Sequence, residues 1–287
     1  MSDLRRVERR MANLRMIREI VHSFRALSAV QYRHASQGLA SLRTYADLFH
    51  RGLTYLDLPS LSQSSPQRLL LIVMGSDQGL CGPLTARVVE RAMNRARELG
   101  NNLFGMVAIG NRTGDLLASQ GAGLVAIHNS PASVRGIDDL VGWVAQTIGH
   151  LLDEQRCDGA EVVAMRLVNS GDSRPELLRV LPIDPASLWE TTGGRPPREP
   201  QLYERSEVVA AAILREWTYI EVYRCALESL TSEHDARLRT TDAATHALDR
   251  KLEELRLEHN HLRQEAITEE ILETVSGAED LLAEDAC

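Results

Sequence analysis

The feature that most constrains the fold is a stretch of 76 residues, 201–276, that contains neither Gly nor Pro. The chain holds 19 Gly and 10 Pro, and 26 of these 29 residues fall between positions 59 and 200. Residues 1–58 contain only Gly38 and Gly52. Because Gly costs roughly 1 kcal/mol and Pro roughly 3 kcal/mol in a helix interior, this distribution predicts two long helical arms on either side of a breaker-rich centre.

Both arms carry apolar residues at helical spacing. From Leu4 to Leu27 apolar residues recur every three or four positions, which is typical of one buried face on a helix. The last arm has a heptad pattern formed by Leu248, Leu252, Leu255, Leu262 and Ala266. At 1.5 Å per residue, 76 helical residues would reach roughly 110 Å. We therefore predict that the arms form an antiparallel two-helix stalk.

The charges of the two arms are complementary. Residues 1–57 carry ten Arg and five acidic residues, whereas residues 228–287 carry sixteen acidic and six basic residues. Opposite charge favours pairing of the arms with each other and disfavours self-pairing. A stalk of only two helices leaves apolar surface uncovered, which indicates that it sits inside or against a partner. A free coiled-coil spacer is the simpler alternative.

The centre alternates short apolar runs with amphipathic stretches. Strands are expected at 68–76, 102–110, 123–128, 162–169 and 177–183, and helices at 84–99, 111–120 and 137–155. This alternation predicts an α/β fold with a Rossmann-like parallel sheet. Residues 184–200 have the composition of a loop. The expected domains are an N-terminal shaft helix (1–58), a Rossmann-like foot (59–200) and a C-terminal shaft helix with an acidic tail (201–287).

Compartment and membrane association follow from what the sequence lacks. No run approaches the roughly 18 apolar residues of a membrane span. The N-terminus MSDLRRVERRM has no apolar segment of the kind that signal peptides contain. We therefore expect an intracellular chain without direct membrane insertion. The four cysteines lack CxxC spacing and are expected to be free thiols; they are Cys81, Cys157, Cys225 and Cys287.

One glycine-rich turn invites a phosphate-binding interpretation. Its characteristic residues are Gly75, Asp77, Gly79, Cys81 and Gly82. The glycines lie four and three positions apart, which matches neither GxGxxG nor the P-loop, and the only lysine, Lys251, is in the last arm. We therefore predict a structural turn in which Asp77 caps a helix. No catalytic, cofactor-binding or metal site is predicted.

Three segments together resemble the gamma subunit of the rotary F-type ATP synthase: the Arg-rich first helix, the turn SDQGLCGPL, and the C-terminal stretch from TSEHDARL to RQEAITEEI. The family turn usually reads SDRGLCGGLN, and the end reads approximately SEQAARMxAMxxAT and NKARQAxITQEL. The matching turn residues are Ser76, Asp77, Gly79, Leu80, Cys81, Gly82 and Leu84. The matching C-terminal residues are Ser232, Glu233, Ala236, Arg237, Ala243, Ala244, Thr245, Asn260, Arg263, Gln264, Ile267, Thr268 and Glu270.

This resemblance, which extends over nearly the whole chain, implies a central-stalk rotor subunit. Such a subunit is a coiled-coil shaft in the bore of an alternating alpha/beta hexamer, with a foot that binds the epsilon subunit and the membrane c-ring. It transmits torque and couples transport of H⁺ or Na⁺ to ATP synthesis or hydrolysis, with no catalytic site or cofactor of its own. It would be a peripheral subunit on the cytoplasmic face of a bacterial-type cell (inner) membrane.

The resemblance also implies which side chains contact partners. On the first helix these are Arg9, Arg10, Ile20, Phe24 and Leu27, and on the last they are Arg237, Asn260, Arg263, Gln264, Thr268 and Glu270. Each of them could instead be a solvated charge or a residue of the stalk seam.

The chain departs from the family pattern at three places. Residues 22–32 lack the family's lysines, Asp242 stands where the family usually has a basic residue, and the chain ends in the acidic sequence EDLLAEDAC. These departures fit a divergent member of the main synthase or of a second, paralogous ATPase.

Other classes of function remain as alternatives. The first is a non-rotary coiled-coil scaffold with a Rossmann-like module, and the second is a small-molecule enzyme that uses the central sheet. Nucleic-acid binding is disfavoured, because only 4% of residues are aromatic and the acidic arm offsets the basic one.

Overall fold

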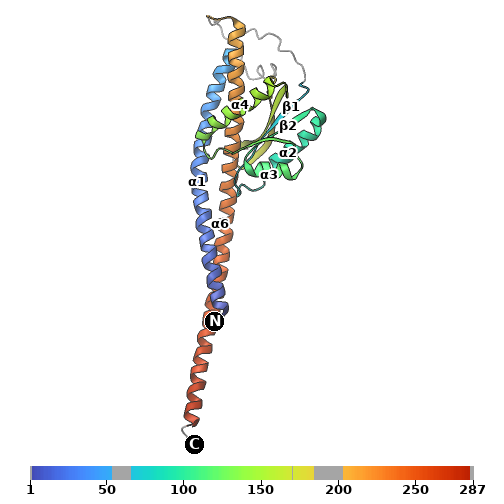
Figure 1. Cartoon of the computed structure of the whole chain (residues 1–287). Coiled ribbons are helices and arrows are strands. Elements are labelled where there is room, and N and C mark those ends of the chain that lie inside the picture. Colours follow the sequence, from blue (N-terminus) through green and yellow to red (C-terminus); the bar gives the residue numbers. More distant parts are fainter. Residues whose placement is uncertain (1, 54–65, 170, 184–202, 285–287) are drawn as a thin grey trace. The chain divides into compact units, whose positions relative to one another are not determined.

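A computed structural model (Figure 1) describes residues 2–53, 66–169, 171–183 and 203–284. The chain divides into two compact units: Met1–Ala26 with Thr240–Cys287, and Leu27–Arg239. Two long helices, α1 (Ser2–Leu53) and α6 (Ser206–Glu284), contribute residues to both units. The two long helical arms that the sequence predicts are therefore confirmed.

The predicted domain boundaries, between residues 58 and 59 and between residues 200 and 201, lie outside the described residues. The predicted loop at 184–200 and the last residues of the acidic tail, 285–287, lie there as well. That division of the chain stays a prediction. The length of the last helix was estimated from residues 201–276. In the structure α6 continues through Gly277 and ends at Glu284.

In the first unit α1 and α6 pack antiparallel. Three pairs of side chains link them: Glu8 with His259 at 3.3 Å, Arg18 with Asp249 at 2.6 Å, and Arg25 with Asp242 at 3.0 Å. In each pair the two residue numbers add up to 267, so the register is constant along the unit. The complementary charges of the arms thus meet across the helix pair.

An apolar seam runs between these helices. Its buried residues are Val7, Met11, Leu252 and Leu255, and Leu14 and Leu262 pack against them. Burial of such side chains is the main favourable term in folding. The exposed ion pairs contribute less, because solvent and salt screen them.

We expect Leu255→Ala to lower the free energy of unfolding by about 2–5 kcal/mol, because the leucine is buried and its removal leaves a cavity. Arg18→Ala is the matched surface change, and its effect should stay within roughly 0–1 kcal/mol. Urea unfolding of the purified chain, followed by helical circular dichroism, measures both. Equal losses in the two variants would contradict the view that the apolar seam holds the pair.

The second unit contains a five-stranded sheet of order β3-β2-β1-β4-β5. In chain order the strands are β1 (Leu69–Met74), β2 (Leu103–Ile109), β3 (Leu124–His128), β4 (Gly159–Asn169) and β5 (Asp172–Leu181). The first four are parallel to their neighbours, as predicted, but β5 is antiparallel to β4. Only residues 170 and 171 separate these two strands, and a parallel pairing would need a crossover of a dozen or more residues.

Helices cover both faces of the sheet. One face packs on α2 (Leu84–Leu99) and α3 (Asn111–Ser119), and the other packs on α4 (Ile137–Asp153) and on parts of the long helices. Short 3-10 turns, η1 (Gly100–Asn102) and η2 (Val134–Gly136), lie before β2 and α4. Strand β1 is buried at every position because both of its faces are covered, which explains its continuous apolar run.

Alternate residues of β1 point to opposite faces. Leu71 and Val73 join the core of the α2 side. Leu70, Ile72 and Met74 join the core of the α4 side, which also contains Ala35 of α1 and Leu227 of α6. Parts of both long helices therefore belong to the core of the second unit.

Gly110, at the end of β2, has no room for a side chain. Its φ is +104°, and an added Cβ would lie 2.6 Å from the carbonyl oxygen of Ser76. We expect Gly110→Ala to lower the free energy of unfolding by roughly 1–3 kcal/mol. Gly142→Ala in α4 meets no atom within 4 Å and should instead stabilise by about 0.5–1 kcal/mol. Denaturant midpoints measure both effects, and an unchanged midpoint for Gly110→Ala would refute the first.

Candidate partner-binding surfaces and the glycine turn

The turn at residues 75–82 follows β1 and packs closely on α3. A Cβ added to Gly75 would lie 2.1 Å from Oγ1 of the buried Thr113, so only glycine fits there. The hydroxyls of Ser76 and Thr85 lie 2.8 Å apart and tie the turn to α2. Leu80 and Gly82 have φ values of +63° and +60°. The turn is therefore a compact connection held by its own hydrogen bonds.

The Asp77 carboxylate joins the ends of two neighbouring strands. Its Oδ1 accepts the backbone N–H of Asn111, the first residue of α3, at 2.6 Å, and its Oδ2 accepts the N–H of Ser130 at 2.9 Å. Asp77 therefore serves a helix N-terminus, but that of α3, whereas the nearest helix in sequence is α2. A carboxylate that accepts two backbone N–H groups at this position stabilises the start of the helix.

The cysteines of the described residues are buried and free. Cys81 lies 3.5 Å from the Ser76 hydroxyl, and burial raises the pKa of Cys157 and that of Cys225, the latter to about 12. A thiol with such a pKa remains protonated and is a poor nucleophile. Cys287 lies outside the described residues. Within the described part of the chain, no cluster of three or more His, Cys, Asp or Glu side chains could hold a metal ion.

Arg237 lies in the interior, unlike the other residues that were expected to contact partners. It is 4% exposed, and its Nε donates to the carbonyl oxygen of Gly79 at 3.3 Å. Its Nη2 donates to the buried carboxylate of Glu233. The guanidinium thus holds the glycine turn against α6, and the structure does not present it to a partner.

Burial changes the protonation of the groups beside Arg237. It raises the pKa of Glu233, which Arg237 partly offsets. For His234, burial and then the Arg237 charge lower the pKa to about 4, so the imidazole is neutral at pH 7. The Nε2 atom of His234 has no hydrogen-bond partner within the described part of the protein.

The remaining expected contact residues reach the surface of their units. Arg9, Arg10, Ile20 and Leu27 of α1 are exposed and Phe24 is half-buried; on α6, Asn260, Arg263, Gln264, Thr268 and Glu270 are exposed. Arg9 Nε donates a hydrogen bond to the Arg5 carbonyl oxygen and Thr268 Oγ1 donates one to the Gln264 carbonyl oxygen, both within their own helices. These side chains have accessible surface for a partner.

The end of α6 carries an apolar surface that the sequence reasoning missed. In the constant register of the helix pair, the first described residue of α1, Ser2, lies opposite position 265. Beyond it, the described part of α1 offers no counterpart. Four apolar side chains there are between 45% and 64% exposed: Ile267, Ile271, Leu272 and Val275. Exposed apolar stripes of this kind mark interaction sites.

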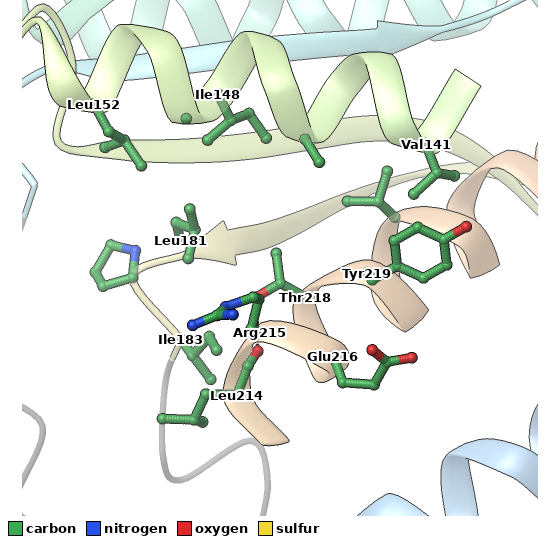
Figure 2. Close-up of a pocket in the computed structure, with 14 residues that line it drawn as sticks. Val141, Ile148, Leu152, Leu181, Ile183, Leu214, Arg215, Glu216, Thr218 and Tyr219 are labelled. Atoms are coloured by element: carbon green, nitrogen blue, oxygen red, sulfur yellow. Dashed lines mark hydrogen bonds between the residues drawn. The ribbon is translucent and has the colours of Figure 1, made fainter. Parts of the chain in front are cut away.

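Figure 2 shows an apolar cavity of about 680 Å³ in the second unit, between α4, the end of β5 and α6. Its lining includes Ile148, Leu181 and Leu214, with Arg215 and Glu216 as charged side chains. Glu216 accepts a hydrogen bond from the Tyr45 hydroxyl at 3.2 Å. No Ser, Cys or His is among the described lining residues. The hydroxyl groups among these residues are those of Thr218 and Tyr219.

Residues 3–281 match the family model described as ATP synthase, which represents the gamma subunit. The chain belongs to the gamma-subunit family of ATP synthases. Members of this family form the central stalk and are non-catalytic parts of the complex. None of the helices in the described part of this gamma-family chain combines the length and apolarity that a membrane crossing requires.

Solved structures confirm the gamma-subunit fold. The chain is similar to one in the Euglena gracilis mitochondrial ATP synthase assembly of OSCP, F1 and c-ring, with a TM-score of 0.68, 14% identity, and coverage of 100% of this chain and 97% of that one. For a chain of the rotor of the same enzyme the TM-score is 0.62 and the identity 14%, with coverage of 93% of this chain and 99% of that one. For a chain in the central stalk and c-ring of the Tetrahymena thermophila mitochondrial ATP synthase the TM-score is 0.58 and the identity 17%, with coverage of 78% of this chain and 99% of that one.

Two departures of this gamma-family chain from the family pattern contact each other. Arg25 lies in the segment 22–32, where the resemblance leads us to expect lysines, and Asp242 stands where it leads us to expect a basic residue. Their side chains form an ion pair at 3.0 Å between α1 and α6. The acidic substitution in one helix is thus matched by an arginine in the other.

The lowered pKa of His234 predicts that the free energy of unfolding depends on pH. The unfolded chain takes up a proton near pH 6.5 and the folded chain only near pH 4, so the contribution of His234 to stability is complete above pH 6.5 and is lost as the pH falls toward 4. The free energy of unfolding of the unmodified protein should therefore fall by about 2 kcal/mol between pH 6.5 and pH 4 because of His234. We expect the His234→Gln variant to lack this contribution. Urea unfolding at several pH values gives the difference between the two proteins. Parallel pH profiles would contradict the assignment, and His246→Gln, at an exposed position, is the control.

Proposed function

We propose that this gamma-family chain transmits torque between a membrane ion-driven ring and an alternating alpha/beta hexamer. The observation that carries the proposal is the end of α6, where apolar side chains beyond the start of α1 are exposed. Such a surface suits insertion into an apolar bore, which would cover it.

The chemistry of the complex would lie in other subunits. A shaft acts on a hexamer only if each of its orientations stabilises one hexamer state over another, because a surface without differential contacts shifts no equilibrium. In the first unit, Met1–Ala26 with Thr240–Cys287, the two helices differ in charge: α1 is mainly basic and α6 is acidic. Rotation of such an asymmetric surface would present different contacts to the three catalytic sites in turn.

The proposed partners are the alpha and beta subunits, the epsilon subunit and the membrane c-ring. This is supported by the assemblies that contain similar chains, which include F1, rotor and c-ring components. We place the chain as a peripheral subunit on the cytoplasmic face of a bacterial-type membrane, with H⁺ or Na⁺ as the coupled ion. Co-purification with two homologous nucleotide-binding subunits in threefold excess tests this, and their absence would favour a non-rotary scaffold.

The contact residues on the shaft are also part of the proposal. We assign hexamer contacts to Arg9, Arg10, Ile20, Phe24, Leu27, Asn260, Arg263, Gln264, Thr268 and Glu270, which reach the surface wholly or in part. Arg237 is left out because it is buried. We test Arg263 and Gln264 first, because they are adjacent and exposed, and their guanidinium and amide groups can both form directed hydrogen bonds to a partner.

We expect the double substitution Arg263→Ala and Gln264→Ala to lower ATP-driven ion pumping by at least about tenfold, since truncating a central contact residue typically costs about 1–2 kcal/mol and about 1.4 kcal/mol corresponds to tenfold. Reconstituted vesicles containing the whole complex measure pumping and ATP hydrolysis together. Arg256→Ala is the matched control, because Arg256 is an exposed arginine on the same helix whose guanidinium pairs with Glu253 at 3.1 Å. Pumping equal to that of the unmodified complex would refute the assignment.

A further inference from the structure

One segment of α6 is buried on all sides and is nevertheless polar. Residues 228–235 are all buried, and every one of them except Leu230 has a polar or charged side chain. A helix on a protein surface normally buries a single apolar stripe. Burying polar groups costs free energy unless they form hydrogen bonds. The position of this segment therefore calls for a physical reason.

The segment is bonded to backbone atoms at one edge of the sheet. Ser229 Oγ donates to the carbonyl oxygen of Met74, the last residue of β1, at 3.3 Å. The Asp235 carboxylate accepts the N–H of Gly171, which lies between β4 and β5, at 3.2 Å. Together with the bond from Arg237 to Gly79, these contacts join α6 to the carboxyl ends of β1 and β4.

This edge is the topological switch point of the sheet. From β1 the chain continues to β2 and β3 on one side, and then crosses over to β4 on the other side of β1. In open α/β sheets the crevice outside the carboxyl ends at such a point is where ligands bind. In this protein side chains of its own helix α6 occupy that position.

We propose that this crevice holds the shaft helix in place of a ligand, and that residues 229–237 of α6 form the joint through which torque passes between the sheet and the shaft. Asp235 and Arg237 are its positioning residues. The proposal rests on the rotor function proposed above and names the residues that connect the two parts of the rotor.

Directed bonds suit a joint under torque better than apolar contacts do. Apolar burial is non-directional, so a helix packed only by it could turn about its axis with little initial loss. Hydrogen bonds weaken steeply when their angles change, and they are stronger in a dry interior. Bonds to fixed backbone atoms therefore define one rotational setting of α6 on the sheet.

Gly171 is the clearest example, because α6 holds both of its backbone polar groups. Its N–H is accepted by Asp235, and its carbonyl oxygen accepts a hydrogen bond from Arg239. Arg239 also pairs with the Asp235 carboxylate at 2.8 Å. A Cβ on Gly171 would lie 3.0 Å from the Arg239 guanidinium, and its φ is +96°. The two α6 side chains thus close around one peptide unit next to β4.

The test uses the whole complex reconstituted in vesicles, with Asp235→Ala as the first variant. Asp249→Ala is the matched control, because Asp249 is another α6 carboxylate bonded to an arginine, Arg18, but far from the sheet in sequence. We measure the ratio of ATP-driven ion pumping to ATP hydrolysis. We also measure the angular fluctuations of a bead on the foot while the hexamer is fixed to a surface.

For Asp235→Ala we expect hydrolysis to continue, pumping per ATP to fall and the angular fluctuations to widen, with no such change in the control. Amide exchange of Gly171 should be roughly tenfold faster, because its bond to a charged acceptor is lost. A variant that assembles with unmodified pumping per ATP and unmodified angular width overturns the proposal.

Arg239→Gln covers the case in which Asp235→Ala does not assemble. Arg239 is half exposed, so its replacement leaves the buried helix surface in place while removing the cation that bridges Asp235 and Gly171. We expect the same changes in smaller degree, and their absence overturns the proposal. Failure of the unmodified chain to drive pumping would instead refute the rotor function itself.

Discussion

The structure depends on one uninterrupted helix. α6 contributes residues to both compact units, and it can do so because nothing in 201–276 breaks a helix. A single Gly or Pro near the middle would introduce a flexible point or a kink. Isolated helices of ordinary length are marginal in water, so most of the stability of α6 must come from what it packs against. Each part of α6 therefore needs a surface that covers it.

Those surfaces differ in kind along the helix. In the first unit α6 packs on α1 through a narrow apolar seam with exposed ion pairs on its flanks. In the second unit the segment around Asp235 is held by hydrogen bonds to backbone atoms of the sheet. The first arrangement tolerates bending, because side chains in an apolar seam adjust to small shifts. The second specifies a rotational setting, which is what a part that transmits twist requires.

Much of the fold could be predicted because its signals are local. Strand β1, the helix after it and the seam of Leu252 and Leu255 follow from periodicity. The direction of β5 was missed because the strand–helix alternation of the earlier part was extended to the last strand, although even the seven residues between the expected strands 162–169 and 177–183 are too few for a parallel crossover. Opposite charge predicted that the two arms pair with each other. Which residues face each other became known only from contacts such as that of Arg18 with Asp249.

The candidate site was harder to predict, for a physical reason. Residues 228–235 have the composition of a solvated helix face, and periodicity cannot reveal that the carboxyl edge of a sheet covers them. The family resemblance placed Arg237 among the partner contacts, although it is one of the least exposed charged residues described. By contrast, the polar side chains of Arg263 and Gln264 are expected to be exposed, and both are exposed in the structure.

The burial of this segment also determines its charge. The pKa of His234 falls to about 4, so the imidazole keeps its uncharged form near neutral pH. A histidine with an ordinary pKa would change its charge between pH 5 and 8. Inside the joint such a change would place a cation beside Arg237 in a medium of low dielectric constant, where like charges repel strongly. The same burial that strengthens the polar contacts thus keeps His234 uncharged near neutral pH, beside the Arg237 guanidinium and its hydrogen bond to Glu233.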